Sequence, residues 1–348
     1  MMRVLVATDA WHPQINGVVR SLENVAREAP ELGAEIVFLT PDMFRTWPMP
    51  SYPEIRLAIT FASSVRRKMA AFKPDFVHIA TEGPIGLAAR RACLREGQSF
   101  TTSYHTRFPE YLAARLPVPT DWSYAALRRF HNAGAGIMVS TGTIERELAA
   151  RGFGPLMRWS RGVDASLFRP RPDAPRPFAG PVFLYVGRVA VDKNIEAFLK
   201  LDLPGTKVVV GDGPARPALQ ATYPETRFLG SLTGKALAEV YSVADVFVFP
   251  SATDTFGIVL LEALASGLPV AALPVAGPID VIGPSQCGVL DHDLGKAALA
   301  ALEIPGARCR AYGLTFTWQA SARQFLDNIR LAHGAATGGG DGAFAIAS

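Results

Sequence analysis

The chain has 348 residues, of which 49% are hydrophobic and 19% charged. This length suits two domains of ordinary size, each with its own core. No apolar run is long enough to span a bilayer, and the first residues lead directly into an apolar strand without a signal-type segment. We therefore expect a cytoplasmic protein whose contact with a membrane is at most peripheral.

The basic charge is confined to the first half of the chain. Residues 1–172 carry 22 Lys and Arg against 15 Asp and Glu, whereas residues 173–348 carry 13 against 16. A basic half of this kind indicates an anionic partner, such as a membrane surface or a nucleic acid. The alternative is that the arginines only solvate the surface.

Cysteine usage excludes a disulfide framework. Cys93, Cys287 and Cys309 are odd in number and form no C-x-x-C pair, so they are predicted to be buried thiols. Asp291 and Asp293 form a D-x-D sequence, but an alanine-rich helical stretch follows, so a helix cap is expected there and no metal site is assigned.

The first half alternates strands and helices. Residues 3–8 and 35–40 are predicted strands, and Gly17 lies at the start of the helix between them. The proline-rich segment 41–53 is predicted to be a long loop, and residues 59–72 a helix carrying Arg66, Arg67 and Lys68.

His105 directly follows a strand that ends at Tyr104. It is therefore expected at the carboxyl edge of a parallel sheet, where open α/β folds bind ligands. His78 lies inside a predicted strand and is expected to be an ordinary strand residue.

A segment rich in Pro and Arg, residues 169–180, is predicted to link two domains, and residues 182–186 begin the second. The turn after this strand carries two cations, Arg188 and Lys193. An arginine fork and a lysine point charge suit a phosphate group, although both side chains could simply be solvated.

Two carboxylates flank a glycine in the stretch 253–267. A buried strand at 246–250 precedes Asp254, and a helix carrying Glu262 begins near Phe256, Gly257 and Ile258. The unpaired N–H groups of such a helix start favour an anion such as a diphosphate. Alternatively, Asp254 only caps the helix and Glu262 is solvated or salt-bridged.

The pattern acidic-x-Phe-Gly-x4-Glu, followed by Ala-Leu-Ala-Ser-Gly-Leu-Pro-Val, resembles the signature of retaining glycosyltransferases of family 4. The segments Pro-Gln-Ile-Asn-Gly-Val-Val-Arg and Gly-Val-Asp at 162–164 are also similar to that family. The family has the GT-B fold, with two facing Rossmann-like, doubly wound parallel-sheet domains and a C-terminal crossover helix. The resemblance thus implies an acceptor domain at 1–172, a nucleotide-sugar domain at 173–315 and a crossover helix at 316–333, and we expect residues 334–348 to be disordered.

The resemblance also implies roles for particular residues. The expected catalytic groups are His105 on the donor sugar, Arg188 and Lys193 on the leaving diphosphate, and Asp254 where the family usually has Glu. Expected donor contacts are Gly17 and the helix start Phe256, Gly257 and Ile258 on the diphosphate, Glu262 on the ribose and Gly230 at the base. Arg107 and Tyr111 are acceptor-side candidates. No metal or other cofactor is expected, because the two cations neutralise the leaving group.

The predicted activity is therefore transfer of a hexose from a UDP- or GDP-linked donor to a membrane lipid such as diacylglycerol, at the inner face of the cell membrane. The alternatives are a soluble α-mannosyltransferase acting on a glycan or inositol head group, and a nucleotide-sugar-binding protein without turnover. Three features favour the lipid acceptor: the basic first half, the apolar residues of the 41–53 segment, and a helix that carries Arg66, Arg67 and Lys68 with apolar Phe61, Val65, Met69 and Phe72. The alternative is that these apolar residues pack into the core of the first domain.

Overall fold

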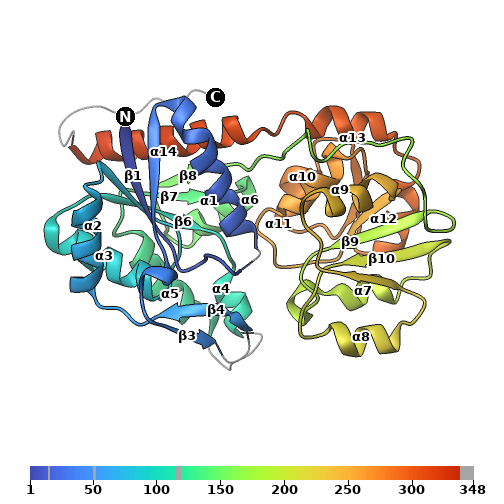
Figure 1. Ribbon diagram of the computed structural model, residues 1–348, viewed down its shortest axis with the longest axis horizontal. Helices are drawn as coiled ribbons and strands as arrows, with labels where there is room; N and C mark the ends of the chain where they lie inside the picture. The colour runs from blue at the N-terminus through green and yellow to red at the C-terminus, as the bar shows by residue number, and fades with distance from the viewer. Residues whose placement is uncertain (15, 50–51, 114–118, 338–348) are drawn as a thin grey trace.

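Two buried apolar runs, one near the start of the chain and one at Val182–Val186, form strands inside two separate parallel sheets. The computed structural model describes residues 1–337 except 15, 50, 51 and 114–118, and the side chains of 52–54, 111–113 and 335–337 are also outside the described part. The two domains lie side by side and meet along a central interface (Figure 1). The predicted pair of facing parallel-sheet domains is confirmed.

The first domain has a six-stranded parallel sheet with helices on both faces. In sheet order its strands are β2 (Ala34–Leu39), β1 (Met2–Ala7), β5 (Phe76–Ile79), β6 (Phe100–Tyr104), β7 (Gly136–Val139) and β8 (Leu156–Arg158). Its helices are α1 (Gly17–Glu28), α2 (Ala62–Phe72), α3 (Pro84–Glu96), α4 (Phe108–Ala113), α5 (Thr120–His131) and α6 (Gly142–Ala150), with 3₁₀ turns η1 (Ala29–Leu32) and η2 (Pro41–Met43).

The second domain also has a six-stranded parallel sheet, and its strand order reverses next to β9. In sheet order the strands are β11 (Arg227–Gly230), β10 (Thr206–Val210), β9 (Val182–Val186), β12 (Val246–Phe249), β13 (Val270–Ala272) and β14 (Gly288–Leu290). Around them lie η3 (Val191–Lys193), α7 (Ile195–Leu199), α8 (Arg216–Thr222), α9 (Gly234–Val243), α10 (Ile258–Ala265), α11 (Ala276–Val281), α12 (Leu294–Ala301) and α13 (Gly306–Gly313).

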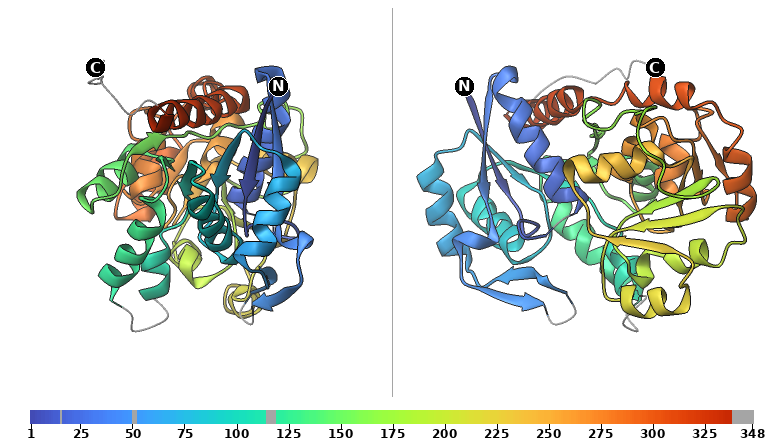
Figure 2. Two further views of the ribbon diagram at one scale, coloured as in Figure 1. Left: turned by 90° about the vertical axis from the view of Figure 1, so that its left-hand side faces the viewer. Right: turned by 45° about the vertical axis from the view of Figure 1, so that its right-hand side comes forward.

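The last helix, α14 (Trp318–Thr337), returns to the first domain. Both views of Figure 2 show this red helix lying across one end of that domain. Ala322, Phe325, Leu326 and Ile329 are buried there in one cluster with strand β1 and helix α1. The predicted crossover helix is therefore confirmed, because the first domain's core is incomplete without it. The expected disordered tail begins inside α14, and residues 338–348 lie outside the described part.

The predicted long loop at 41–53 is wrong. After η2 the chain forms a two-stranded antiparallel hairpin, β3 (Thr46–Met49) and β4 (Tyr52–Ala58), at one end of the first domain (Figure 1). Its prolines suggested a loop, but an isolated two-stranded ribbon has edges on both sides that tolerate residues without an N–H donor.

The three cysteines are free and buried, as predicted. His78 is a buried residue of β5 whose ring bonds to Thr101 Oγ1 at 2.8 Å and Ser103 Oγ at 2.9 Å. Burial lowers the pKa of this imidazole to about 3, so it stays neutral and structural.

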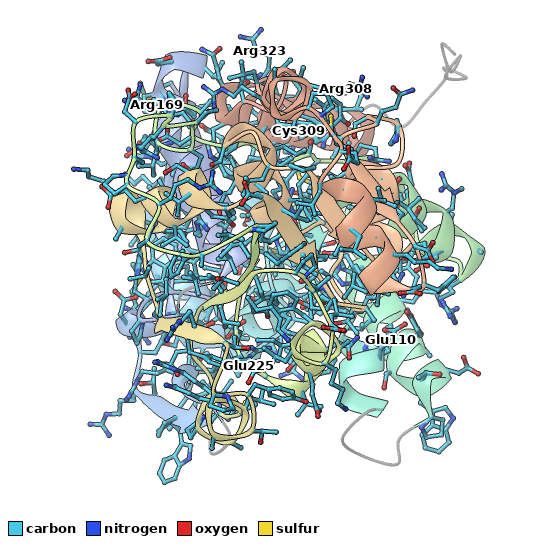
Figure 3. All side chains as sticks on the ribbon, turned by 90° about the vertical axis from the view of Figure 1, so that its right-hand side faces the viewer. Glu110, Arg169, Glu225, Arg308, Cys309 and Arg323 are labelled. Carbon is cyan, nitrogen blue, oxygen red and sulfur yellow. The ribbon has the colours of Figure 1, made fainter. Side chains whose placement is uncertain are left out.

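Figure 3 views the molecule from the side of the second domain, and Arg169, Arg308 and Arg323 lie toward the end occupied by α13 and α14. Glu225 and Glu110 lie toward the opposite end.

No helix of the described residues is both long and apolar enough to cross a bilayer.

Candidate active site

Three charged candidates of the second domain lie at the point where its strand order reverses. Arg188 and Lys193 follow β9, Asp254 follows β12, and these two strands are neighbours in the sheet. In open α/β sheets the crevice beyond the carboxyl ends at this point is the usual ligand site. The structure thus brings Lys193 and Asp254 together, although they are 61 positions apart along the chain.

Lys193 and Asp254 form an ion pair, with Nζ 2.7 Å from Oδ1. Burial acts to raise the pKa of the Asp254 carboxyl, but the Lys193 ammonium, its hydrogen bond and the more distant Arg188 charge together hold the pKa below its usual value. Asp254 is therefore an anion at neutral pH.

Further hydrogen bonds fix the two loops to one another. Asn194 Nδ2 donates to the Pro250 carbonyl at 3.1 Å, and Thr253 Oγ1 donates to the Asp192 carbonyl at 3.3 Å. Arg188 Nη2 lies 2.7 Å from Asp192 Oδ2, and the Tyr185 hydroxyl donates to the Arg188 carbonyl at 2.8 Å. These bonds fix the turn that carries Arg188 and Lys193.

Helix α10 begins beside these loops without a side-chain cap. Gly257 precedes it with φ of 82°, a left-handed conformation that disfavours other residues. A Cβ there would also lie 3.2 Å from the Leu260 and Phe249 side chains. Phe256 is buried, so the chain enters the helix in one fixed orientation. The N–H groups at this start favour an anion.

The starts of α1 and α10 approach each other across the domain interface. Asn16 caps α1, because its Oδ1 accepts hydrogen bonds from Val18 and Val19 N at 3.0 and 3.1 Å. A Cβ on Gly17 would lie 3.5 Å from the Ile258 side chain. The two predicted diphosphate contacts, Gly17 and Ile258, therefore face each other.

Glu262, predicted to contact a ribose, is 1% exposed and pairs with Arg20 of α1. Its second oxygen accepts from the Tyr241 hydroxyl at 3.1 Å. Sequence reasoning missed both partners. Arg20 could have been found, because it lies one helical turn after Gly17 and so faces the same side of α1. Tyr241 carried no comparable signal.

His105 lies at the domain interface, as its place after β6 predicted. The Thr255 hydroxyl donates to the His105 carbonyl at 2.7 Å, and the Thr255 carbonyl accepts from Ser140 and Thr141. The ring contacts the edge of Trp159, with centroids 5.6 Å apart. Burial, and next the charge of Arg161, lower the pKa of His105 well below its usual value. The ring is therefore neutral at physiological pH.

The remaining candidates lie apart from this cluster. Gly230 ends the edge strand β11 with φ of 77°. Arg107 is paired within the first domain, with Nη2 2.7 and 2.5 Å from the two Glu147 oxygens. Tyr111 lies in α4, but its side chain is outside the described part. The roles predicted for these three residues stay predictions.

Asp293 caps α12 as expected, accepting from Gly295 and Lys296 N at 3.1 Å. Within the described ranges, no three or more His, Cys, Asp and Glu residues are grouped to hold a metal ion. What the site does offer is positive charge from Arg188 and Lys193 and an uncapped helix start. This combination suits a diphosphate lying between the two domains.

Comparisons with known proteins agree with this geometry. The sequence matches the family model Glycosyltransferase Family 4 over residues 15–167 and the model Glycosyl transferases group 1 over residues 180–303. It is 33% identical over 316 residues to a GDP-mannose-dependent alpha-mannosyltransferase of Mycobacterium tuberculosis, covering 83% of each chain. It is 27% identical to the alpha-monoglucosyldiacylglycerol synthase of Acholeplasma laidlawii, covering 77% of this chain and 79% of that protein.

Among solved structures, a sucrose-phosphate synthase of Thermosynechococcus elongatus is similar, with a TM-score of 0.78 at 20% identity. The match covers 96% of this chain and 100% of that one. At this level of identity the likeness establishes the fold.

Proposed function

Because this chain belongs to glycosyltransferase family 4, we propose that it is a retaining hexosyltransferase acting on a membrane lipid such as diacylglycerol. Its donor is a nucleotide diphosphate sugar. The single observation that carries the lipid acceptor is an exposed apolar face beside basic residues on the first domain. The similarity to a monoglucosyldiacylglycerol synthase supports the same choice.

In the proposed reaction the bond between the sugar's anomeric carbon and the diphosphate breaks first, through an oxocarbenium-like state. Arg188, Lys193 and the start of α10 stabilise the negative charge that develops on the departing diphosphate. The acceptor hydroxyl then attacks from the same face and loses its proton to the leaving oxygen, so the anomeric configuration is retained. Holding both reactants between two domains supplies the orientation this attack requires.

The proposed reaction needs no metal, because the two cations and the helix start supply the positive charge that a metal gives other transferases. Transfer is therefore expected to continue at an unchanged rate in excess EDTA. Loss of activity in EDTA that Mg²⁺ or Mn²⁺ restores would contradict this part of the proposal.

The lipid-facing surface is formed by Trp47, Ile59 and Phe61, here called the hairpin face. Their exposed fractions are 66%, 58% and 75%, high for large apolar side chains. Trp47 of β3 lies opposite Leu57 of β4. Ile59 follows two residues after Leu57 and shares its side of the extended chain, whereas Ala58 points inward and is buried.

Other residues predicted to touch lipid do not. Val65 and Met69 are buried in the first domain's core, and Phe44 and Phe72 pack against it. Lys68 lies over the Phe44 ring, 5.3 Å from its centroid. For these residues the core-packing alternative holds, and the apolar contribution to docking falls to the hairpin face.

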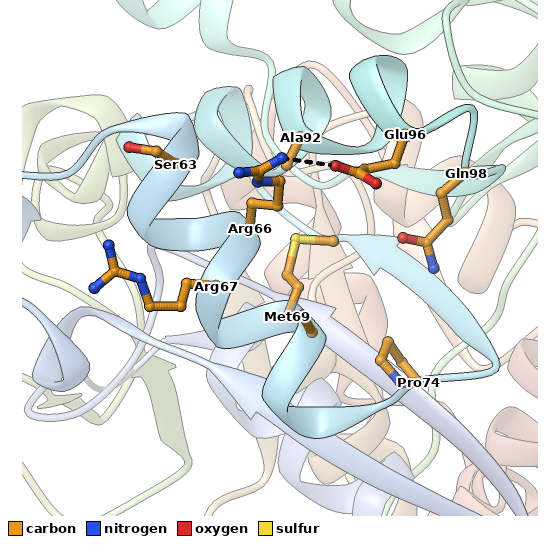
Figure 4. Close-up of a pocket in the computed structure, with 9 residues that line it drawn as sticks. Ser63, Arg66, Arg67, Met69, Pro74, Ala92, Glu96 and Gln98 are labelled. Atoms are coloured by element: carbon orange, nitrogen blue, oxygen red, sulfur yellow. Dashed lines mark hydrogen bonds and ion pairs between the residues drawn. The ribbon is translucent and has the colours of Figure 1, made fainter.

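Basic side chains of α2 follow the hairpin face along the chain, because Phe61 is the residue that precedes this helix. Arg66 and Arg67 line a hollow of about 470 Å³ between α2 and α3, where Arg66 Nη1 is 3.1 Å from Glu96 Oε1 (Figure 4). Arg67 points away from this pair. A basic residue near an anionic leaflet contributes about 1 kcal/mol to binding, and inserted apolar side chains add to it. Together they favour docking on the anionic inner leaflet.

Vesicle binding tests this surface. The full chain is expected to sediment with vesicles of phosphatidylcholine and phosphatidylglycerol at low salt, and less at high salt or without the anionic lipid. Trp47→Ser with Phe61→Ser should weaken binding about tenfold or more, since each removes a large apolar side chain. Leu299→Ser, which changes an exposed leucine of the second domain, is the matched control. Equal and negligible sedimentation under all conditions would remove the lipid acceptor.

A soluble α-mannosyltransferase is the second candidate, and the identity of 33% to a GDP-mannose-dependent enzyme favours it. The two candidates differ in acceptor. Transfer from GDP-mannose to a water-soluble glycan or inositol head group, with none to diacylglycerol in vesicles, would support the second candidate over the first.

A further inference from the structure

Arg161 is a buried arginine next to a predicted catalytic histidine. Only 6% of it is exposed, although arginine is rarely buried without a reason. Its guanidinium lies over the Trp159 ring, 4.0 Å from the centroid. Nη1 donates to the carbonyls of Trp159 and Ser160 at 2.6 and 3.0 Å, and Nη2 lies 3.2 Å from His105 Nδ1.

The direction of the last contact follows from chemistry. A guanidinium has only donors, so His105 Nδ1 must accept the hydrogen bond. A neutral imidazole carries one proton, which must then reside on Nε2. His105 Nε2 is itself buried and has no hydrogen-bond partner among the described residues. Buried N–H groups nearly always have a partner, so this one is suited to a ligand oxygen.

The segment that carries Arg161 is rigidly placed. Ser160 N donates to Gln324 Oε1 at 2.7 Å, and Trp159 Nε1 donates to Ser321 Oγ at 3.2 Å, so α14 anchors both neighbours. A Cβ on Gly162 would lie 2.4 Å from Trp318 N. Arg161 therefore has little freedom to leave His105.

We propose that Arg161 is the positioning residue for His105, holding Nδ1 as an acceptor so that Nε2–H is presented to a hydroxyl of the donor sugar. This inference rests on the proposed function for the identity of the ligand. The charge of Arg161 also opposes protonation of the ring, as do the neighbouring His78 and His131. Arg161 thus fixes the tautomer of His105, and its charge adds to the effect of burial in keeping the ring neutral.

The tautomer can be measured without any turnover. In the full chain labelled with ¹⁵N-histidine, the His105 signals, assigned by their loss in His105→Gln, should show the Nε2–H form from pH 8 to below pH 6. In Arg161→Met the ring should become a mixture of tautomers and should protonate at a higher pH than in wild type. An Nδ1–H tautomer in wild type, or an unchanged ring in Arg161→Met, would overturn the proposal.

Kinetics give an independent readout. Arg161→Met should lower kcat about tenfold, the loss expected for one misdirected hydrogen bond, and add an acidic limb to the pH profile. Arg161→Lys keeps the charge but cannot reach all three acceptors, so kcat should fall without the new limb. Arg310→Met is the control, since Arg310 of α13 also donates to several backbone carbonyls, those of Ala165, Phe168 and Ala265, away from His105.

The positioning role of Arg161 and the proposed function can be contradicted independently of one another. An Nε2–H tautomer that depends on Arg161, in a protein that transfers no sugar to any acceptor, would contradict the proposed function while upholding the positioning role. Normal transfer with an unaltered pH profile in Arg161→Met would overturn the positioning role alone. If Arg161→Met fails to fold, the wild-type tautomer and Arg161→Lys still decide the question.

Discussion

Lys193 and Asp254 show how single residues acquire their properties from partners remote in the sequence. The carboxyl of Asp254 is partly buried, which by itself favours the protonated acid, and the adjacent ammonium reverses this preference. In the substrate complex the same ammonium is proposed to serve the diphosphate. The ion pair would then prepare the lysine for its role by fixing its position before the donor binds.

Lys193→Met should therefore destabilise the protein in a pH-dependent way. The folded-state pKa of Asp254 lies below the unfolded value of about 3.9, so the pair's contribution is present above pH 4 and is lost as pH falls through the folded pKa. At pH 7 we expect a loss of about 2 kcal/mol, below that of a fully buried pair. In Lys193→Met the ammonium is absent, so burial raises the pKa of the Asp254 carboxyl.

Urea unfolding of wild type and Lys193→Met at several pH values from 7 to below 4 measures this difference, which should shrink toward the acid end. Lys235→Met, which alters a highly exposed surface lysine, is the control and should change stability little at any pH. A difference that stays constant or grows as the pH falls would contradict the assigned ion pair.

At the scale of elements, the starts of α1 and α10 form the part of the site that is proposed to face the diphosphate. Asn16 caps the start of α1, and Gly257 enters α10 with a positive φ. Because the two helices belong to different domains, their N–H groups converge only when the domains meet. Both helix starts were predicted from caps, glycines and apolar spacing, which are local signals.

Asn16→Ala should lower the free energy of unfolding by about 1 kcal/mol, since Val18 and Val19 N lose their side-chain acceptor. It should also raise the KM for the donor, because the helix start beside Gly17 becomes less ordered. Asp293→Ala removes an equivalent cap from α12 and is the matched control. An equal rise in KM for both variants would mean that the start of α1 has no special role.

The parts of the fold that were predicted correctly depend on local patterns, and those that were missed depend on tertiary contacts. Strands such as Val182–Val186 appear as uninterrupted apolar runs, so their place in a parallel sheet could be inferred. The β3–β4 hairpin was hidden by Pro48 and Pro53, which a free edge accommodates. Arg20 lies one helical turn after Gly17, which marks its side of α1, but its pairing with Glu262 joins residues 242 positions apart and could not be inferred from local sequence.

At the scale of the whole molecule, candidate active-site residues lie at the interface between the two domains. Arg20 pairs with Glu262, Thr255 bonds to the backbone of His105, and Thr143 N donates to Asp280 Oδ2 at 3.1 Å. The first two contacts each join a predicted site residue to the opposite domain. Movement of one domain against the other would therefore assemble or separate the site as a unit.

Arg188 and Lys193 are proposed to stabilise a departing diphosphate. The most direct test is the initial rate of sugar transfer to diacylglycerol in anionic vesicles, from UDP- and GDP-linked hexoses, for wild type, Arg188→Ala and Lys193→Ala. Loss of one charge-assisted contact should cost roughly 2–4 kcal/mol in the transition state, so each variant should be slower by about 30- to 1000-fold while still folded. Lys235→Ala should retain the wild-type rate. Transfer at near-normal rates in both site variants would contradict the account.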